Sequence, residues 1–83
     1  MYYNFIVENK VGEVYTIRYS RNDYKADLDG IFKIDLINKS TFLVEKSKTE
    51  AGGNGYLKLS TTLILNPEKL QIPLGKRSGV AYG

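Results

Sequence analysis

The chain opens with two stretches in which apolar and polar residues alternate, the two-residue period of half-buried β-strands. They are residues 2–8 (YYNFIVE) and 13–20 (EVYTIRYS), both rich in aromatic and β-branched residues. A three-residue loop over residues 10–12 would put Gly12 in the left-handed conformation that glycine favours. Apolar residues then face one another: Tyr3 with Tyr19, Phe5 with Ile17, and Val7 with Tyr15. The pattern predicts an N-terminal β-hairpin with one buried face.

A second hairpin is predicted over residues 31–48 (IFKIDLINKSTFLVEKSK), where two apolar runs flank a short polar break. A three-residue loop over residues 38–40 gathers large apolar groups on one face. In this register Leu36 faces Phe42, Ile34 faces Val44, and Phe32 faces Lys46. On the other face Lys33 meets Glu45, an opposite-charge pair. A two-residue loop would set Ile34 against Glu45, so we prefer the odd-numbered loop.

The C-terminal part is predicted to hold a long strand, a helical turn and a short edge strand. Residues 56–65 (YLKLSTTLIL) read as a strand with four leucines on one face: Leu57, Leu59, Leu63 and Leu65. Asn66, Pro67 and Glu68 suit a helix cap, a first helical position and an acid near the helix dipole, which predicts one helical turn near residues 67–70. Residues 70–74 (LQIPL) would add an edge strand, because proline is confined to sheet edges.

These elements predict a small all-β protein. The charged residues 21–30 and the glycine-rich residues 49–55 read as loops. No repeat or linker divides the chain, so we expect residues 1–83 to form a single domain, with residues 75–83 as a flexible tail. Five to six short strands favour a small antiparallel barrel or a strongly twisted sheet, of SH3-like or OB-like type. An open sheet and a two-layer sandwich are the alternatives.

The residue inventory excludes several chemistries. The chain has no cysteine, histidine or tryptophan, which rules out disulfides, Cys/His zinc sites and Cys- or His-based nucleophiles. The run Asp27 to Gly30 matches part of an EF-hand calcium loop, but Lys25 and Leu36 stand where the first and last oxygen ligands belong. The basic run 76–78 lacks the earlier glycine of a phosphate-binding loop. We expect no metal, no cofactor and no enzymatic activity.

Charge and hydropathy bear on location and partners. No run approaches the roughly 18 apolar residues of a membrane span, and the N-terminal residues lack the basic start of a signal peptide. We therefore expect a cytoplasmic protein with no membrane association. The net charge is +3, and residues 31–83 carry eight bases and four acids against four bases and five acids in residues 1–30. Such an excess favours an anionic partner, although a charge this small is also ordinary for a soluble domain.

Two binding hypotheses follow. In the first, the hairpin face opposite the core contacts a protein partner or a second copy of the chain, because its apolar residues need cover. The candidate residues are Ile6, Ile31, Lys33, Ile37, Leu43 and Glu45. In the second, nucleic acid binds to cations that contact phosphates and tyrosines that stack on bases. The candidates are Arg18, Arg21, Tyr24, Tyr56, Lys58, Lys76 and Arg77. We favour protein association slightly over nucleic-acid binding.

Overall fold

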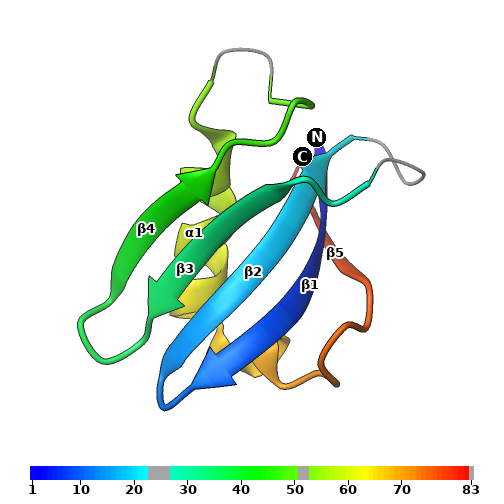
Figure 1. Ribbon diagram of the computed structural model, residues 1–83. Helices are drawn as coiled ribbons and strands as arrows, with labels where there is room; N and C mark the ends of the chain where they lie inside the picture. The colour runs from blue at the N-terminus through cyan, green and yellow to red at the C-terminus, as the bar shows by residue number, and fades with distance from the viewer. Residues whose placement is uncertain (23–26, 51–52, 83) are drawn as a thin grey trace.

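Four strands joined in chain order form most of one antiparallel sheet, and a fifth strand from the C-terminal part completes it (Figure 1). The computed structural model describes residues 1–22, 27–50 and 53–82. The strands are β1 (Tyr2–Val11), β2 (Val14–Arg21), β3 (Gly30–Asp35), β4 (Ser40–Glu45) and β5 (Ser78–Ala81). Their order in the sheet is β4-β3-β2-β1-β5. The prediction of a small, mostly β fold is confirmed, and β4 and β5 are the edges of this sheet.

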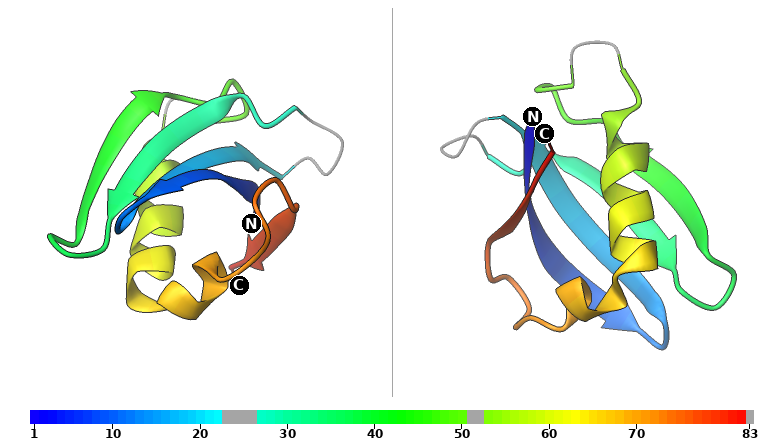
Figure 2. Two further views of the ribbon diagram at one scale, coloured as in Figure 1. Left: turned by 60° about the horizontal axis from the view of Figure 1, so that its bottom comes forward. Right: turned by 180° about the vertical axis from the view of Figure 1, so that it is seen from behind.

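One helix and one helical turn cover a single face of the sheet. Between β4 and β5 the chain forms α1 (Gly55–Leu65) and the 3₁₀ helix η1 (Pro67–Leu70). The sheet curves around α1, which lies on its concave side (Figure 2). Twelve buried apolar residues form the core between them: Tyr3, Phe5, Val7, Tyr15, Ile17, Tyr19, Phe32, Ile34, Leu59, Leu63, Leu70 and Val80.

The predicted strand over residues 56–65 is wrong, because this segment is the helix α1. Leu59 and Leu63 are four residues apart and both fully buried, as one stripe of a helix requires. Ser60 lies on the same buried side, whereas Leu57 and Leu65 are 45% and 73% exposed. The two-residue spacing of the leucines is therefore incidental, and the four-residue spacing is the one that the core uses.

The first hairpin has the predicted buried face but a different register. Phe5 pairs with Tyr19 and Val7 pairs with Ile17, a shift of two residues from the predicted pairing. The turn is shorter than expected, because Val11 pairs with Val14. Gly12 does adopt the left-handed conformation, with φ of 58°. A bulge between Val7 and Asn9 inserts one extra residue in β1, which keeps the apolar side chains of both strands on the concave face.

The second hairpin also departs from the predicted register, because its loop spans residues 36–39. Asp35 sets this loop: its Oδ1 accepts hydrogen bonds from the backbone N–H of Ile37 at 2.9 Å and of Asn38 at 3.2 Å. Lys39 then takes a left-handed φ of 50°. As a result Phe32 pairs with Leu43, and the following pairs are Lys33 with Phe42, Ile34 with Thr41, and Asp35 with Ser40.

This register reverses the predicted faces of β4. Leu43 packs against the core instead of facing outward, and Phe42 and Val44 face outward instead of packing inside. Val44 is an extra residue at a bulge, after which Glu45 pairs with Ile31. The predicted pairing of Lys33 with Glu45 is therefore wrong.

The helical turn near residues 67–70 is confirmed by η1. The side chain of Asn66 does not cap η1. Its side-chain nitrogen, Nδ2, instead donates to the carbonyl oxygen of Thr62 at 2.8 Å, at the end of α1. The predicted edge strand over residues 70–74 is wrong. Leu70 is the last residue of η1, and the residues after it belong to the connection that leads to β5. At its end the N–H of Gly75 donates to the carbonyl of Val7 at 2.9 Å.

The last strand lies within residues 75–83, the segment predicted to be a flexible tail. Ser78–Ala81 pairs with β1, with Tyr3 opposite Val80 and Asn4 opposite Gly79. Val80 is buried, and Gly79 leaves room for the ring of Tyr2, which a side chain there would overlap. The expected flexibility is therefore wrong for these residues, because backbone pairing and burial hold them to β1.

Candidate interaction surface

The outer edge of β4 is open. β4 pairs with β3 along one side, and no other described strand pairs with its opposite side. In Figures 1 and 2, β4 lies at the margin of the sheet, with α1 beneath it on the concave side. Its sequence, STFLVE, contains no lysine or proline, the residues that often protect edge strands. The protective features found in the strand itself are the bulge at Val44 and the charged side chain of Glu45, its last residue.

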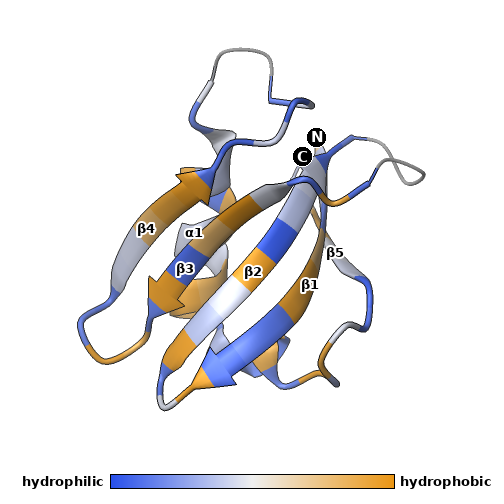
Figure 3. Cartoon of the chain, viewed as in Figure 1, coloured by the Kyte–Doolittle hydropathy of each residue, from blue (hydrophilic) through white to orange (hydrophobic). Residues whose placement is uncertain are grey.

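Large apolar side chains stand beside this open edge. Phe42 is 67% exposed and Val44 is 50% exposed, and both belong to β4. Ile37, at the loop that leads into β4, is 76% exposed. Figure 3 shows hydrophobic colour on the later part of β4, whereas the beginning of the strand is pale. We define the β4 surface as Phe42, Val44 and the backbone edge of Ser40–Glu45.

Most of the predicted protein-interface residues lie near the β4 surface. On β3, Lys33 pairs with Phe42 and Ile31 pairs with Glu45, so these residues share the convex face of the sheet. Ile37 lies in the adjoining loop. Ile6 is separated from them, because Arg18 of β2 stands between Ile6 and Ile31 in the sheet. Leu43 belongs to the opposite face, as described above, and is removed from the set.

Sequence reasoning missed Phe42 and Val44, which it assigned to the core. The residue in the sequence that could have indicated the true loop is Asp35, which lies four residues before Lys39. Aspartate favours loops in which its side chain accepts hydrogen bonds from the following backbone N–H groups. A loop begun by Asp35 shifts the pairing so that Phe42 faces outward.

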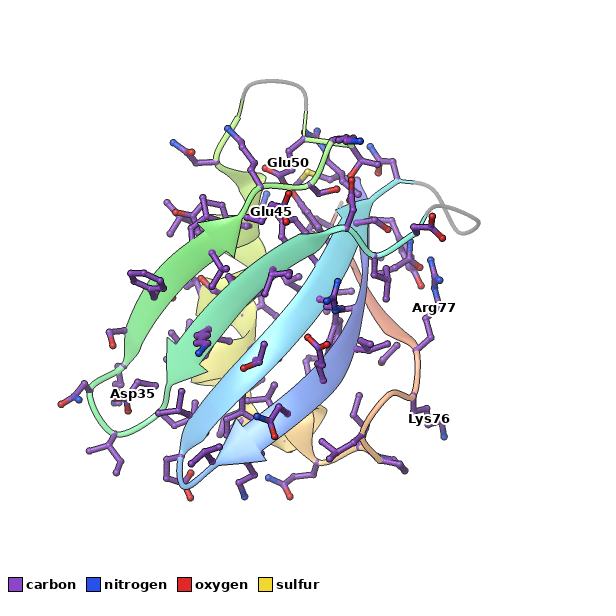
Figure 4. The ribbon with its side chains drawn as sticks, in the orientation of Figure 1. Asp35, Glu45, Glu50, Lys76 and Arg77 are labelled. Atoms are coloured by element: carbon purple, nitrogen blue, oxygen red, sulfur yellow. The ribbon has the colours of Figure 1, made fainter. Side chains whose placement is uncertain are left out.

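The other sheet edge offers a weaker surface for strand pairing. β5 has four residues, against six in β4, and one of them is Gly79. Lys76 and Arg77 precede it on an exposed loop, labelled in Figure 4. A short edge strand is a common protection against unwanted pairing, and a glycine weakens a strand further. β4 is therefore the better edge for binding another strand.

The candidate nucleic-acid residues are spread over different parts of the molecule. Arg18 lies on β2, where its Nε is 2.9 Å from Oε2 of Glu8. Lys58 lies on α1, with its Nζ 4.8 Å from the ring centre of Tyr82. Tyr56, also on α1, packs against the core ring of Phe32 with 6.0 Å between centroids. These three residues do not form one continuous stacking surface.

The remaining candidates for nucleic-acid contact do not join the others. Arg21 ends β2, and its backbone N–H donates to Oγ1 of Thr49 at 2.8 Å. Lys76 and Arg77 lie together on the loop before β5 (Figure 4). Tyr24 lies outside the described residues. Within the described part of the chain, these candidates therefore occur as single residues or as small groups such as Lys76 and Arg77.

Polar side chains at one end of the sheet hold the connection between β4 and α1. Ser47 Oγ donates to Oδ1 of Asp29 at 2.6 Å, and the N–H of Lys48 donates to Oδ2 at 3.1 Å. The Ser47 bond is the main reason that the pKa of Asp29 lies below its usual value. The N–H of Ser47 also donates to the Tyr19 hydroxyl at 3.2 Å. These bonds fix the connection against β2 and β3.

A buried carboxylate extends this network to the start of α1. Oε1 of Glu50 accepts a hydrogen bond from the Tyr3 hydroxyl at 2.7 Å, and Glu50 is 4% exposed. Burial, with the hydrogen bond to Glu50 as the next cause, raises the pKa of Tyr3 above its ordinary value. Figure 4 labels Glu50 at this end of the molecule. The ionisable groups of this network bond to one another or to the backbone, so their contacts serve to hold the fold.

The described residues contain neither a pocket nor a group of three or more acidic side chains placed to hold a metal ion. The described helices are also too short to cross a membrane. Comparison of the chain with protein-family models, with curated proteins and with solved structures gives no match. The candidate site therefore depends on the geometry of the β4 surface alone.

Proposed function

We propose that this protein is a non-catalytic binding module that associates with another protein through the β4 surface. The observation that carries the proposal is the exposure of Phe42 and Val44 on an edge strand that has one open side. A strand added to such an edge gains main-chain hydrogen bonds, and side chains beside the edge supply specificity. A cytoplasmic location remains a prediction.

The contact would join two kinds of interaction. The backbone of β4 offers N–H and C=O groups along its open side, which a partner strand can pair with. Phe42 then provides an apolar anchor, because fully burying such a side chain contributes about 1.5–3 kcal/mol. Lys33, which pairs with Phe42 across the strands, places a positive charge beside this anchor. The surface therefore suits an extended partner segment with apolar and acidic side chains.

A peptide-display selection tests this proposal. Random peptides are selected on the wild-type protein, and fluorescence anisotropy then measures their binding to two variants. Phe42→Lys should weaken the selected peptides by roughly tenfold or more, since it removes the anchor and charges the edge. Leu65→Lys is the matched control, because Leu65 is 73% exposed at the end of α1. Peptides that bind wild type and Phe42→Lys equally well would contradict the proposal.

Nucleic-acid binding is the alternative function, and it has less support because its candidate residues lie on several elements. Lys76 and Arg77 are its strongest feature, as two adjacent exposed cations. A titration with single-stranded and duplex oligonucleotides at two salt concentrations tests it. Affinity that falls steeply with salt would favour nucleic acid, because released counterions dominate such binding.

A further inference from the structure

We infer that Asn54 is a site of spontaneous deamidation, and that the carboxylate of Glu50 holds this reaction back in the folded protein. Asn54 is followed by Gly55, and an asparagine before a glycine is the sequence most prone to lose its side-chain amide. Glycine has no Cβ, so its backbone nitrogen can approach the asparagine side chain closely. The site lies in the connection between β4 and α1, outside the β4 surface.

The reaction needs only the chain itself and water. The Gly55 nitrogen loses its proton and attacks Cγ of Asn54, so that a Cγ–N bond forms and Nδ2 leaves as ammonia with that proton. Water then opens the five-membered succinimide ring at either of its carbonyl carbons, which gives aspartate or isoaspartate. In total one water is consumed and one ammonia is released, and nothing is oxidised or reduced.

The structure leaves the side chain of Asn54 open to this reaction. Asn54 is exposed and directly precedes the first residue of α1, yet its side chain makes no cap hydrogen bond. The residue before it, Gly53, has open space beside it, since a Cβ there would meet nothing within 4 Å. Water can therefore reach the amide carbon, and the capping bond that usually occupies such an asparagine is absent.

Packing requires the glycine that makes Asn54 reactive. A Cβ atom on Gly55 would overlap the Tyr3 hydroxyl and lie 2.9 Å from Oε1 of Glu50. A larger residue after Asn54 would slow the attack, but the contact between β1 and the start of α1 excludes it. The reactive pair is therefore a consequence of how α1 packs on the sheet.

The same contact holds the attacking nitrogen away from Asn54 Cγ. At the ψ of 42° that Asn54 adopts, the Gly55 nitrogen lies on the side of the Cα–C bond away from Cβ, so ring closure must turn the peptide group. That group is held at both polar atoms: the N–H of Gly55 donates to Oε2 of Glu50 at 2.9 Å, and the carbonyl oxygen of Asn54 accepts from the N–H of Leu57 at 3.0 Å. Glu50 is 4% exposed and is itself held by the Tyr3 hydroxyl. Deamidation therefore proceeds through a local opening that breaks these bonds.

Deamidation also makes the opening permanent. Isoaspartate carries the main chain through Cγ and adds one carbon atom between Cα of residue 54 and the nitrogen of Gly55. The N–H of Gly55 is then displaced from Glu50, and the buried carboxylate loses a donor.

Incubation at neutral pH, followed by trypsin digestion and mass spectrometry, tests the site. Trypsin releases residues 49–58, in which Asn54 has the only side-chain amide. This peptide should gain the mass of an amide-to-acid conversion and separate into aspartate and isoaspartate forms. The folded protein should react at least roughly tenfold more slowly than the same chain in urea, because it must first break the bond to Glu50. An unmodified peptide in urea, or equal rates in the two states, would overturn the inference.

Three variants, each confirmed as folded by circular dichroism, test the role of Glu50. Glu50→Ala should raise the rate in the folded protein by roughly tenfold and leave the rate in urea unchanged. Tyr3→Phe keeps the acceptor of Gly55 and only loosens Glu50, so it should give a smaller rise. Ile34→Ala is the control for general loss of stability, since Ile34 is fully buried near the other end of β3.

An unchanged rate in Glu50→Ala would contradict the role of Glu50. A rise in Ile34→Ala as large as that in Glu50→Ala would contradict it as well, because global unfolding would then explain both. If Glu50→Ala does not fold, the comparison of Tyr3→Phe with Ile34→Ala decides in the same way.

Discussion

The Tyr3 hydroxyl donates a hydrogen bond to Oε1 of Glu50 at 2.7 Å, which ties the first strand to the connection before α1. The other carboxylate oxygen, Oε2, accepts from the N–H of Gly55 at 2.9 Å, at the first residue of the helix. Asn54, at the usual capping position, makes no side-chain cap. Glu50 therefore replaces it, and its carboxylate lies where the helix dipole favours negative charge.

Removing the Tyr3 hydroxyl should destabilise the protein. Tyr3→Phe leaves Oε1 of Glu50 buried without this donor, which costs about 1–3 kcal/mol of the free energy of unfolding. Urea denaturation followed by circular dichroism measures the change. Tyr15→Phe is the control, because Tyr15 is also buried and its hydroxyl makes no hydrogen bond within the described residues. Equal losses for the two variants would show that the bond to Glu50 is not a specific contributor.

Gly55→Ala should reverse the ordinary effect of this substitution. In a helix, alanine is favoured over glycine by about 1 kcal/mol. At this position a Cβ atom would overlap the Tyr3 hydroxyl and crowd Oε1 of Glu50. We expect a net loss of about 1–3 kcal/mol from overpacking, measured as a lower midpoint of urea denaturation. Gly53→Ala, which adds a Cβ with no neighbour within 4 Å, should change stability by less than about 0.5 kcal/mol. A stabilised Gly55→Ala variant would contradict the described contact.

The protein should lose stability in alkaline solution. Burial raises the pKa of Tyr19 from 10.0 to about 12, and burial also raises the pKa of Tyr3. In the unfolded chain both hydroxyls ionise near their ordinary pKa, so above it the unfolded state binds fewer protons than the folded state. The free energy of unfolding is therefore unaffected below pH 10 by these groups and falls as pH rises through the folded pKa values.

Denaturation curves across this pH range, with tyrosinate absorbance as a second readout, measure the fall. Tyr3→Phe removes one of the two raised groups and should make the decline of stability with pH shallower than in wild type. An unchanged slope would mean that Tyr3 ionises equally easily in both states.

Two leucine substitutions distinguish the helix from the predicted strand. Leu59 is fully buried, so Leu59→Ala should cost about 2–5 kcal/mol through lost contacts and a cavity. Leu65 is 73% exposed, so Leu65→Ala should change stability by less than about 0.5 kcal/mol. In the predicted strand both side chains would share one buried face and give similar losses. Urea denaturation of the two variants decides between these outcomes.

Strand periodicity predicted the buried face of the first hairpin correctly. It did not predict which residues of the two strands pair. The side chains of Phe5, Val7 and Ile17 alternate whatever the turn length, so their burial follows from the pattern alone. Register also depends on the bulge between Val7 and Asn9, which no residue type in the sequence marks. A short turn and a bulge together give the same faces as a longer turn without one.

Two later elements were missed for different physical reasons. In residues 56–65 the leucines are spaced both two and four apart, so strand and helix patterns coexist, and packing of α1 on the sheet decides between them. β5 has a single large apolar residue, Val80, and its pairing partner β1 lies at the other end of the chain. Local sequence carries little information about such a distant pairing.

The candidate site was predicted only in part. Ile31, Lys33, Ile37 and Glu45 do lie near the open edge, because the convex face of β3 follows from its alternation. Phe42 and Val44 were placed inside because a three-residue loop was assumed. One residue of loop length moves every side chain of the following strand to the other face. The wrong loop length is therefore the reason that Phe42, the anchor of the proposed interface, was predicted to be buried.

Pairing between β1 and β5 also bears on the order in which the fold is assembled. The β1–β2, β2–β3 and β3–β4 pairs join neighbours in the chain, whereas β1–β5 joins Tyr2 to Ala81. Contacts between residues far apart in the chain form slowly, because the entropy cost of closing the loop comes before any stabilising contact. Without β5 the outer side of β1, the longest strand, would be an open edge of the sheet, and in the described structure the four-residue β5 covers part of it. The C-terminal strand therefore shields the longest strand of the sheet from unwanted pairing, and a chain cut before Ser78 would expose that edge.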